Sequence, residues 1–142
     1  AGAAIAAERM AELLGSFDFA DTAAVLAFMA KLNPRVPLGA SLFAADVRAR
    51  FSRPHIRALL ASVRPEHGLP PEKLAALSMP TLLLWGRLDR LMPPEMLAWY
   101  RAHLPPGAVI EEPACGHCPQ VDRPVWTARR ILRFSQALRG DG

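Results

Sequence analysis

The sequence lacks several features that would assign it to common classes of protein. No apolar run approaches the ~20 residues that a membrane-spanning helix needs, and membrane insertion is not expected. The net charge of +4 is almost all arginine, scattered among acids without a basic block, and this argues against nucleic-acid binding. Two cysteines are too few for a disulfide framework, and no basic segment precedes an apolar leader, so we expect a cytoplasmic protein.

The first part of the chain, residues 1–75, contains helical patterns and turns without a convincing strand. Asp21 is placed to cap the second of these helices, and a cluster of prolines ends this part at residues 65–71. The periodicity of apolar residues predicts four helices, over Ala3–Leu14, Ala23–Leu32, about Leu42–Phe51 and His55–Val63.

The second part, residues 76–142, contains two short and continuously apolar runs, Thr81–Trp85 and Ala108–Glu112. Continuous runs of this kind are typical of parallel strands that are buried on both faces. A helix that begins at Pro93-Pro94-Glu95 lies between them, so we expect a right-handed parallel crossover.

A last helix follows the second run. It is predicted to be capped by Asp122 and to end at Gly140. Its apolar positions predict an inner face made of Val125, Ile131, Leu132, Phe134 and Leu138.

Asp89 and His117 are the strongest candidates for a functional site, because each follows one of the two predicted strands. Ligands of open parallel sheets bind outside the carboxyl ends of the strands, and neighbouring strands are only ~4.8 Å apart. An acid and a histidine brought together there can act as a pair. The histidine moves a proton, while the acid fixes its tautomer and stabilises the imidazolium.

The sequence around these two residues resembles a known superfamily. Residues 80–93, PTLLLWGRLDRLMP, are similar to the acid-bearing segment of α/β-hydrolase-fold enzymes, and residues 116–124, GHCPQVDRP, are similar to their histidine segment. The resemblance implies an α/β fold in which 76–142 form the last two parallel strands with their helices and 1–75 form a helical cap. It also implies that Asp89 is the acid and His117 the base of a Ser-Asp-His triad.

The nucleophile turn of that superfamily, Gly-x-Ser-x-Gly, does not occur in the 142 residues. Gly39-Ala40-Ser41 supplies half of it, but Phe43 stands where a small residue is needed and two prolines interrupt the segment before it, so we expect a helix start there. The resemblance implies that the early strands and the nucleophile precede the cap. We therefore expect the chain to be incomplete and inactive alone, with serine as the expected nucleophile and aspartate, as in haloalkane and epoxide hydrolases, as the alternative.

The sequence also leaves two other classes of function open. Cys115-Gly116-His117-Cys118 has the spacing of a redox dithiol, but Pro119 follows at once and too little chain remains for a thioredoxin-like domain. The chain could also be a non-catalytic fragment or an interaction module. No second Cys/His cluster offers metal ligands, so neither metal nor cofactor is expected. The favoured interpretation is a hydrolase that acts on an ester or related bond of a small, fairly apolar substrate.

Overall fold

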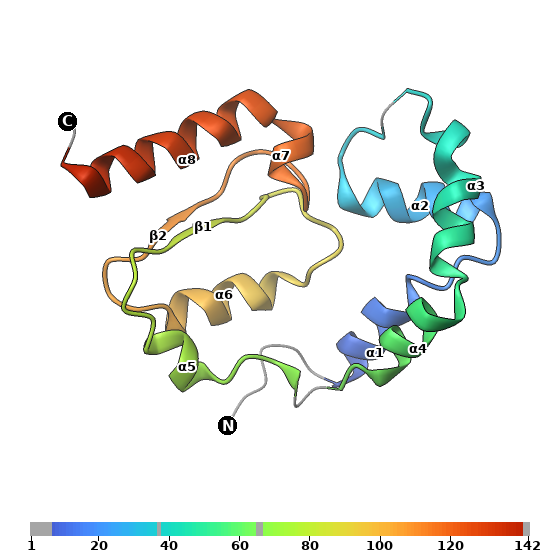
Figure 1. Cartoon of the computed structure of the whole chain (residues 1–142), viewed down its shortest axis with the longest axis horizontal. Coiled ribbons are helices and arrows are strands. Elements are labelled where there is room, and N and C mark those ends of the chain that lie inside the picture. Colours follow the sequence, from blue (N-terminus) through green and yellow to red (C-terminus); the bar gives the residue numbers. More distant parts are fainter. Residues whose placement is uncertain (1–6, 37, 65–66, 141–142) are drawn as a thin grey trace.

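The structure, a computed structural model, describes residues 7–36, 38–64 and 67–140. Figure 1 shows two regions side by side, which we call the helical region and the strand region. The helical region contains α1 (Ala7–Gly15), α2 (Thr22–Leu32), α3 (Ala40–Phe51) and α4 (Pro54–Ser62). The strand region contains α5 (Pro71–Ala75), β1 (Leu82–Leu84), α6 (Pro94–His103), β2 (Val109–Glu111), α7 (Pro119–Asp122) and α8 (Pro124–Arg139).

All four helices predicted in the first part of the chain are present, with ends shifted by a few residues. The predicted start of the first helix, at Ala3, lies outside the described residues. Asp21 caps α2 as expected, because its Oδ1 accepts a hydrogen bond of 2.8 Å from the Ala24 N–H. Gly39, at φ +87°, precedes α3 in a left-handed conformation that glycine adopts without strain.

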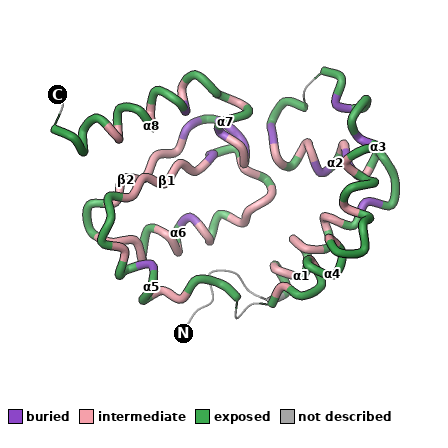
Figure 2. Tube along the Cα trace, in the orientation of Figure 1, coloured by how far each residue is buried: buried purple, intermediate pink, exposed green. Residues whose placement is uncertain are grey.

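The helical region has a closed hydrophobic core between α2 and α3. Val25 and Ala44 are fully buried, and Figure 2 shows the buried stretches of both helices. Four aromatic rings pack around this centre with ring centroids between 4.9 and 5.7 Å apart: Phe17, Phe19, Phe28 and Phe51. Contacts at these separations add to the energy gained by burying the rings.

The two predicted strands form a parallel pair, β1 with β2, in which Leu83 lies opposite Ile110. Helix α6 connects them, as the crossover prediction required. Each strand is shorter than its apolar run, and its residues are half-buried rather than buried on both faces.

One helix covers each face of this strand pair (Figure 1). Glu111 forms an ion pair with Arg130 of α8, whereas its neighbour Glu112 forms one with Arg101 of α6. Successive strand residues point to opposite faces, so these adjacent carboxylates hold different helices and do not act together.

The end of the chain differs from the prediction in two ways. Pro119 begins the short helix α7, so Asp122 ends that helix instead of capping α8, and Arg123 occupies the cap position. The predicted inner face of α8 is confirmed only at Phe134. Thr127, Arg130 and Phe134 face inward, while most of the predicted apolar face is exposed, namely Val125, Ile131, Leu132 and Leu138. The predicted end at Gly140 is confirmed by its left-handed backbone at φ +72°.

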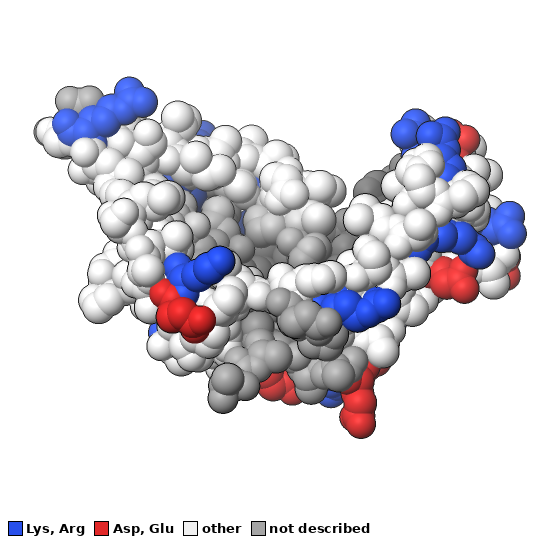
Figure 3. Space-filling view, turned by 60° about the horizontal axis from the view of Figure 1, so that its bottom comes forward, with Lys and Arg blue, Asp and Glu red and all other residues white. Residues whose placement is uncertain are grey.

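On the face shown in Figure 3, the charged side chains form small separate groups in which lysine or arginine often lies beside an acid. Among the described residues, this face carries no extended patch of one charge. No helix in the described part of the chain is both long and apolar enough to cross a bilayer.

Candidate active site

Asp89 lies in the loop that joins β1 to α6, and its carboxylate is fixed by the backbone of that loop. Oδ1 accepts hydrogen bonds from the N–H groups of Leu91, at 2.8 Å, and Met92, at 3.1 Å. Its own N–H donates to the carbonyl of Gly86 at 3.0 Å, which closes a tight turn after the strand. The side chain is only 5% exposed, so the loop presents a buried and oriented carboxylate.

His117 lies in the loop between β2 and α7 and meets Asp89 directly. Its Nδ1 lies 2.8 Å from Asp89 Oδ2. A carboxylate only accepts hydrogen bonds, so Nδ1 carries the proton and Nε2 is the nitrogen available for a reacting group. The imidazole side chain is 31% exposed, so one side of the ring is accessible while the other rests on Asp89.

The surroundings shift both pKa values in the direction that keeps this pair charged. Burial raises the pKa of Asp89, but hydrogen bonds from His117, Met92 and Leu91 outweigh it and hold the pKa below its ordinary value. The hydrogen bond to Asp89 raises the pKa of His117 above its ordinary value, against the opposing effect of burial. The imidazolium is therefore stabilised next to an ionised acid.

Backbone pairing continues past the strands and brings the two loops together. Arg87 N–H donates to the Pro113 carbonyl and Leu88 N–H to the Cys115 carbonyl, each at 2.9 Å. Gly86 makes this approach possible, because a Cβ there would lie 1.8 Å from the backbone oxygen of Gly116.

The C-terminal end of α2 contacts both loops. The Lys31 carbonyl accepts from the Arg90 N–H at 3.3 Å, and the Leu32 carbonyl accepts from the His117 N–H at 2.6 Å. These are orphan carbonyls of the last helical turn, and they form the negative end of the helix dipole. We call this contact the α2 junction. It positions the two loops and adds a favourable field for a positively charged His117.

Side chains reinforce the α2 junction. Gly116 N–H donates to Asp122 Oδ2 at 2.6 Å. The amide of Asn33 is buried, and in the orientation that its neighbours require it donates to Asp122 Oδ1 and to the Leu32 carbonyl, each at 3.2 Å. The loop is tight here, since a Cβ on Gly116 would lie 2.2 Å from the Leu32 oxygen. Sequence reasoning missed these roles, because Asn33-Pro34 looked like a helix end and Asp122 like a helix cap.

The remaining candidates do not form a comparable arrangement. Ser41 is exposed in the first turn of α3, and no strand precedes it in the described residues. Cys115 and Cys118 are free thiols, and burial together with the Asp122 carboxylate raises the pKa of each. Redox dithiols need the opposite shift. Within the described ranges, no three His, Cys, Asp or Glu side chains are grouped to hold a metal ion.

Comparison with known proteins identifies the family. The model of the α/β hydrolase fold family matches residues 6–124. The chain belongs to the α/β hydrolase fold family. The fold class and superfamily predicted from the sequence are thereby confirmed, and the two-stranded parallel sheet is consistent with part of a hydrolase fold. The boundary between a cap and a core near residue 75 stays a prediction.

Two solved structures resemble this α/β hydrolase chain. One is 2-hydroxy-6-oxo-6-phenylhexa-2,4-dienoate hydrolase from Rhodococcus sp. strain RHA1, with a TM-score of 0.69, 18% identity and coverage of 96% of this chain and 52% of that one. The other is a membrane phospholipase A described as a bacterial virulence factor, with a TM-score of 0.68, 25% identity and coverage of 92% and 44%.

A curated relative is the uncharacterized hydrolase YugF of Bacillus subtilis (strain 168). It is 32% identical over 79 residues, which are 55% of this chain and 29% of YugF. This chain thus spans about half the length of the solved structures it matches and under a third of YugF.

Proposed function

We propose that this chain supplies the acid and the base of a catalytic triad, Asp89 and His117, to a hydrolase that cleaves an ester or related bond. The observation that carries the proposal is the 2.8 Å contact between a buried carboxylate and a partly exposed imidazole after two adjacent parallel strands. Structural helices and loops do not need an acid and a histidine in this arrangement, whereas proton transfer does.

The proposed mechanism follows from the two nitrogens of His117. With Nδ1 held by Asp89, Nε2 accepts the proton of the attacking hydroxyl and later returns it to the leaving group. The imidazolium that forms in between is stabilised by Asp89 and by the carbonyl end of α2. The nucleophile is a serine on a Gly-x-Ser-x-Gly turn, a motif these 142 residues do not contain, and an aspartate there is the alternative.

The proposed substrate is a small and fairly apolar molecule. Leu91, Met92 and Pro93, which come two to four residues after Asp89, line part of a cavity beside it, and charged side chains such as Arg9 and Glu12 line the rest. Apolar walls close to a few polar groups are typical of sites for small molecules. Of the two solved structures, one is named a dienoate hydrolase and the other a phospholipase A, and these names support hydrolysis as the reaction class.

The test is His117→Ala in the whole protein, assayed with a p-nitrophenyl ester. We expect kcat to fall by about 10³-fold or more, because the proton has no other acceptor at the site. The matched control is His55→Ala, on the exposed face of α4, which is expected to retain activity. Full activity in His117→Ala would overturn the assignment, as would an equal loss in both variants.

A further inference from the structure

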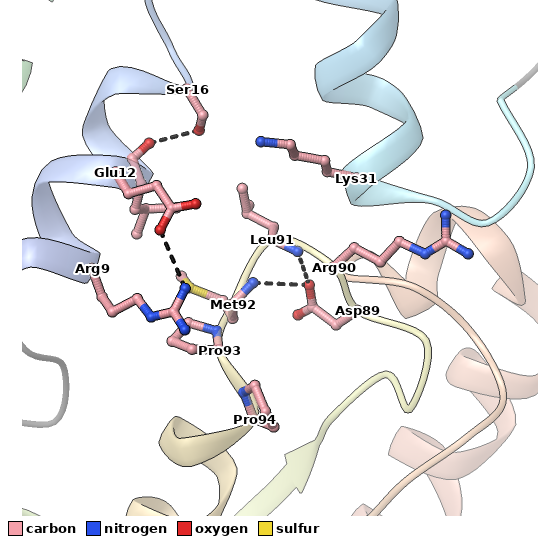
Figure 4. A pocket seen from close by; sticks show the side chains of 11 residues that line it. Arg9, Glu12, Ser16, Lys31, Asp89, Arg90, Leu91, Met92, Pro93 and Pro94 are labelled. Atoms are coloured by element: carbon pink, nitrogen blue, oxygen red, sulfur yellow. Dashed lines mark hydrogen bonds and ion pairs between the residues drawn. The ribbon is translucent and has the colours of Figure 1, made fainter.

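A cavity of about 230 Å³ lies beside Asp89, between α1, the end of α2 and the loop that joins β1 to α6 (Figure 4). Asp89 lines it, whereas His117 is not among the lining residues. The volume is below the roughly 300–1,000 Å³ of pockets for drug-sized ligands, so the group it accommodates is small.

Among the charged side chains that line this cavity, the acids are paired with other protein groups, whereas Lys31 has no such partner in the described part of the chain. Both acids that line it are already engaged, Glu12 by Arg9 at 3.2 Å and Asp89 by His117 at 2.8 Å. Lys31 forms no ion pair with any residue in the described ranges. Figure 4 shows its ammonium pointing into the cavity and the guanidinium of Arg90 pointing away. The cavity therefore offers one cation that lacks a counter-charge.

We propose that this cavity binds a carboxylate of the substrate, with Lys31 as its partner. A single ammonium matches a single negative charge, and the nearby carboxylates of Glu12 and Asp89 disfavour a dianion such as phosphate. Leu91, Met92 and Pro93 provide apolar walls for the methylene groups next to that carboxylate.

This assignment rests on the proposed function and makes its substrate class more specific. The substrate is then a half-ester of a short dicarboxylic acid, with the free carboxylate at Lys31 and the ester at His117 Nε2. Leu91 and Met92 line the cavity beside Asp89, so the acyl chain of the proposed substrate is placed along these two side chains.

The activity test compares two p-nitrophenyl esters of similar size in the whole protein, the neutral valerate and the mono-ester of glutaric acid. In Lys31→Gln we expect the ratio of kcat/KM for the glutarate ester to kcat/KM for the valerate ester to fall about tenfold, mainly through a higher KM for the glutarate ester. The wild-type preference for the glutarate ester is expected to shrink as salt screens the charge.

The chain offers a matched control, because Lys73 on α5 is the other lysine in the sequence. Lys73→Gln is expected to leave both esters unaffected. An unchanged ratio of the two kcat/KM values in Lys31→Gln would overturn the carboxylate site while leaving the proposed function intact.

A binding measurement separates the two proposals. Glutarate is titrated into the wild type, Lys31→Gln and Lys73→Gln by calorimetry, with inorganic phosphate as a second probe. We expect glutarate to bind the wild type and Lys73→Gln, and to bind Lys31→Gln about tenfold more weakly, with phosphate weaker than glutarate throughout. Equal glutarate binding by all three proteins, or no binding by any, would overturn the site even if neither ester were hydrolysed, an outcome that would count against the proposed function.

Discussion

The helical region and the strand region are built in different ways. In the helical region, Val25 and Ala44 are fully buried and four phenylalanine rings close around them. In the strand region, both strands are half-buried, and apolar residues of α8 such as Val125 and Leu132 are 62% and 60% exposed. The catalytic candidates belong to the strand region, and the α2 junction ties them to the helical region. Side-chain packing thus holds the first region, while backbone contacts fix the geometry of the site.

The largest expected effect comes from breaking the α2 junction with Gly116→Ala. The new Cβ would lie 2.2 Å from the Leu32 oxygen, a backbone atom that cannot move without shifting α2. We expect a loss of about 3 kcal/mol or more, with the His117 loop released while amides of α2 and α3 stay protected. Urea unfolding and hydrogen exchange measure the two effects.

The control for that variant is Gly15→Ala, where a Cβ would meet nothing within 4 Å. It is expected to be neutral or slightly stabilising, because alanine favours helices over glycine. If Gly116→Ala unfolded both regions together, the regions would be one cooperative unit and the comparison would fail.

A pair of truncations sharpens the contrast in packing. Val25→Ala removes two methyl groups from a fully buried site and is expected to lower the free energy of unfolding by about 2 kcal/mol. Leu132→Ala, on the exposed face of α8, is expected to change it by less than about 0.5 kcal/mol. Urea denaturation of both variants gives the comparison. An equal loss in Leu132→Ala would mean that this face of α8 is covered in the protein in solution.

The smallest change concerns the titration of His117. Asp89→Asn removes the charged acceptor that raises the histidine pKa, so the midpoint of the imidazole titration is expected to move to lower pH. Proton NMR of the ring measures it, with His55→Ala used to assign the signals. An unchanged midpoint would show that the strand region does not hold the pair as described.

The same shifts set the pH range in which the pair stabilises the fold. The pKa of His117 is raised, so its contribution is complete below about pH 6.5 and is lost as pH rises through the folded value. The pKa of Asp89 is lowered, so its contribution is present above about pH 3.8 and is lost as pH falls through the folded value. The stabilisation by the pair is therefore largest between these limits. The proposed mechanism requires a neutral His117, so activity is expected to rise on the alkaline side.

The sequence predicted correctly those features that depend on the type of side chain at a given position. The apolar runs predicted the parallel strands, and the position of Asp89 and His117 just after them predicted their contact. Asp21 was recognisable as a cap because capping needs a short acceptor at that position.

The sequence did not predict the α2 junction or the role of Asp122. The first depends on backbone carbonyls, and the second on which of two N–H groups Asp122 binds. The carbonyls of Lys31 and Leu32 hold the two loops, and no side chain indicates such contacts. Asp122 had two possible uses, and the start of α7 at Pro119 decided between capping α8 and binding the Gly116 N–H. On α8, Arg130 forms an ion pair with Glu111, while most of the apolar positions that the sequence predicted to face inward are exposed.

The attachment of both loops to one helix end couples the motions of acid and base. Lys31 and Leu32 are successive residues, so a displacement of α2 carries the Asp89 loop and the His117 loop in the same direction. Such a movement preserves the separation within the pair and changes the position of both relative to a nucleophile. The helical region can therefore reposition Asp89 and His117, the proposed proton-transfer groups, as one body without separating them.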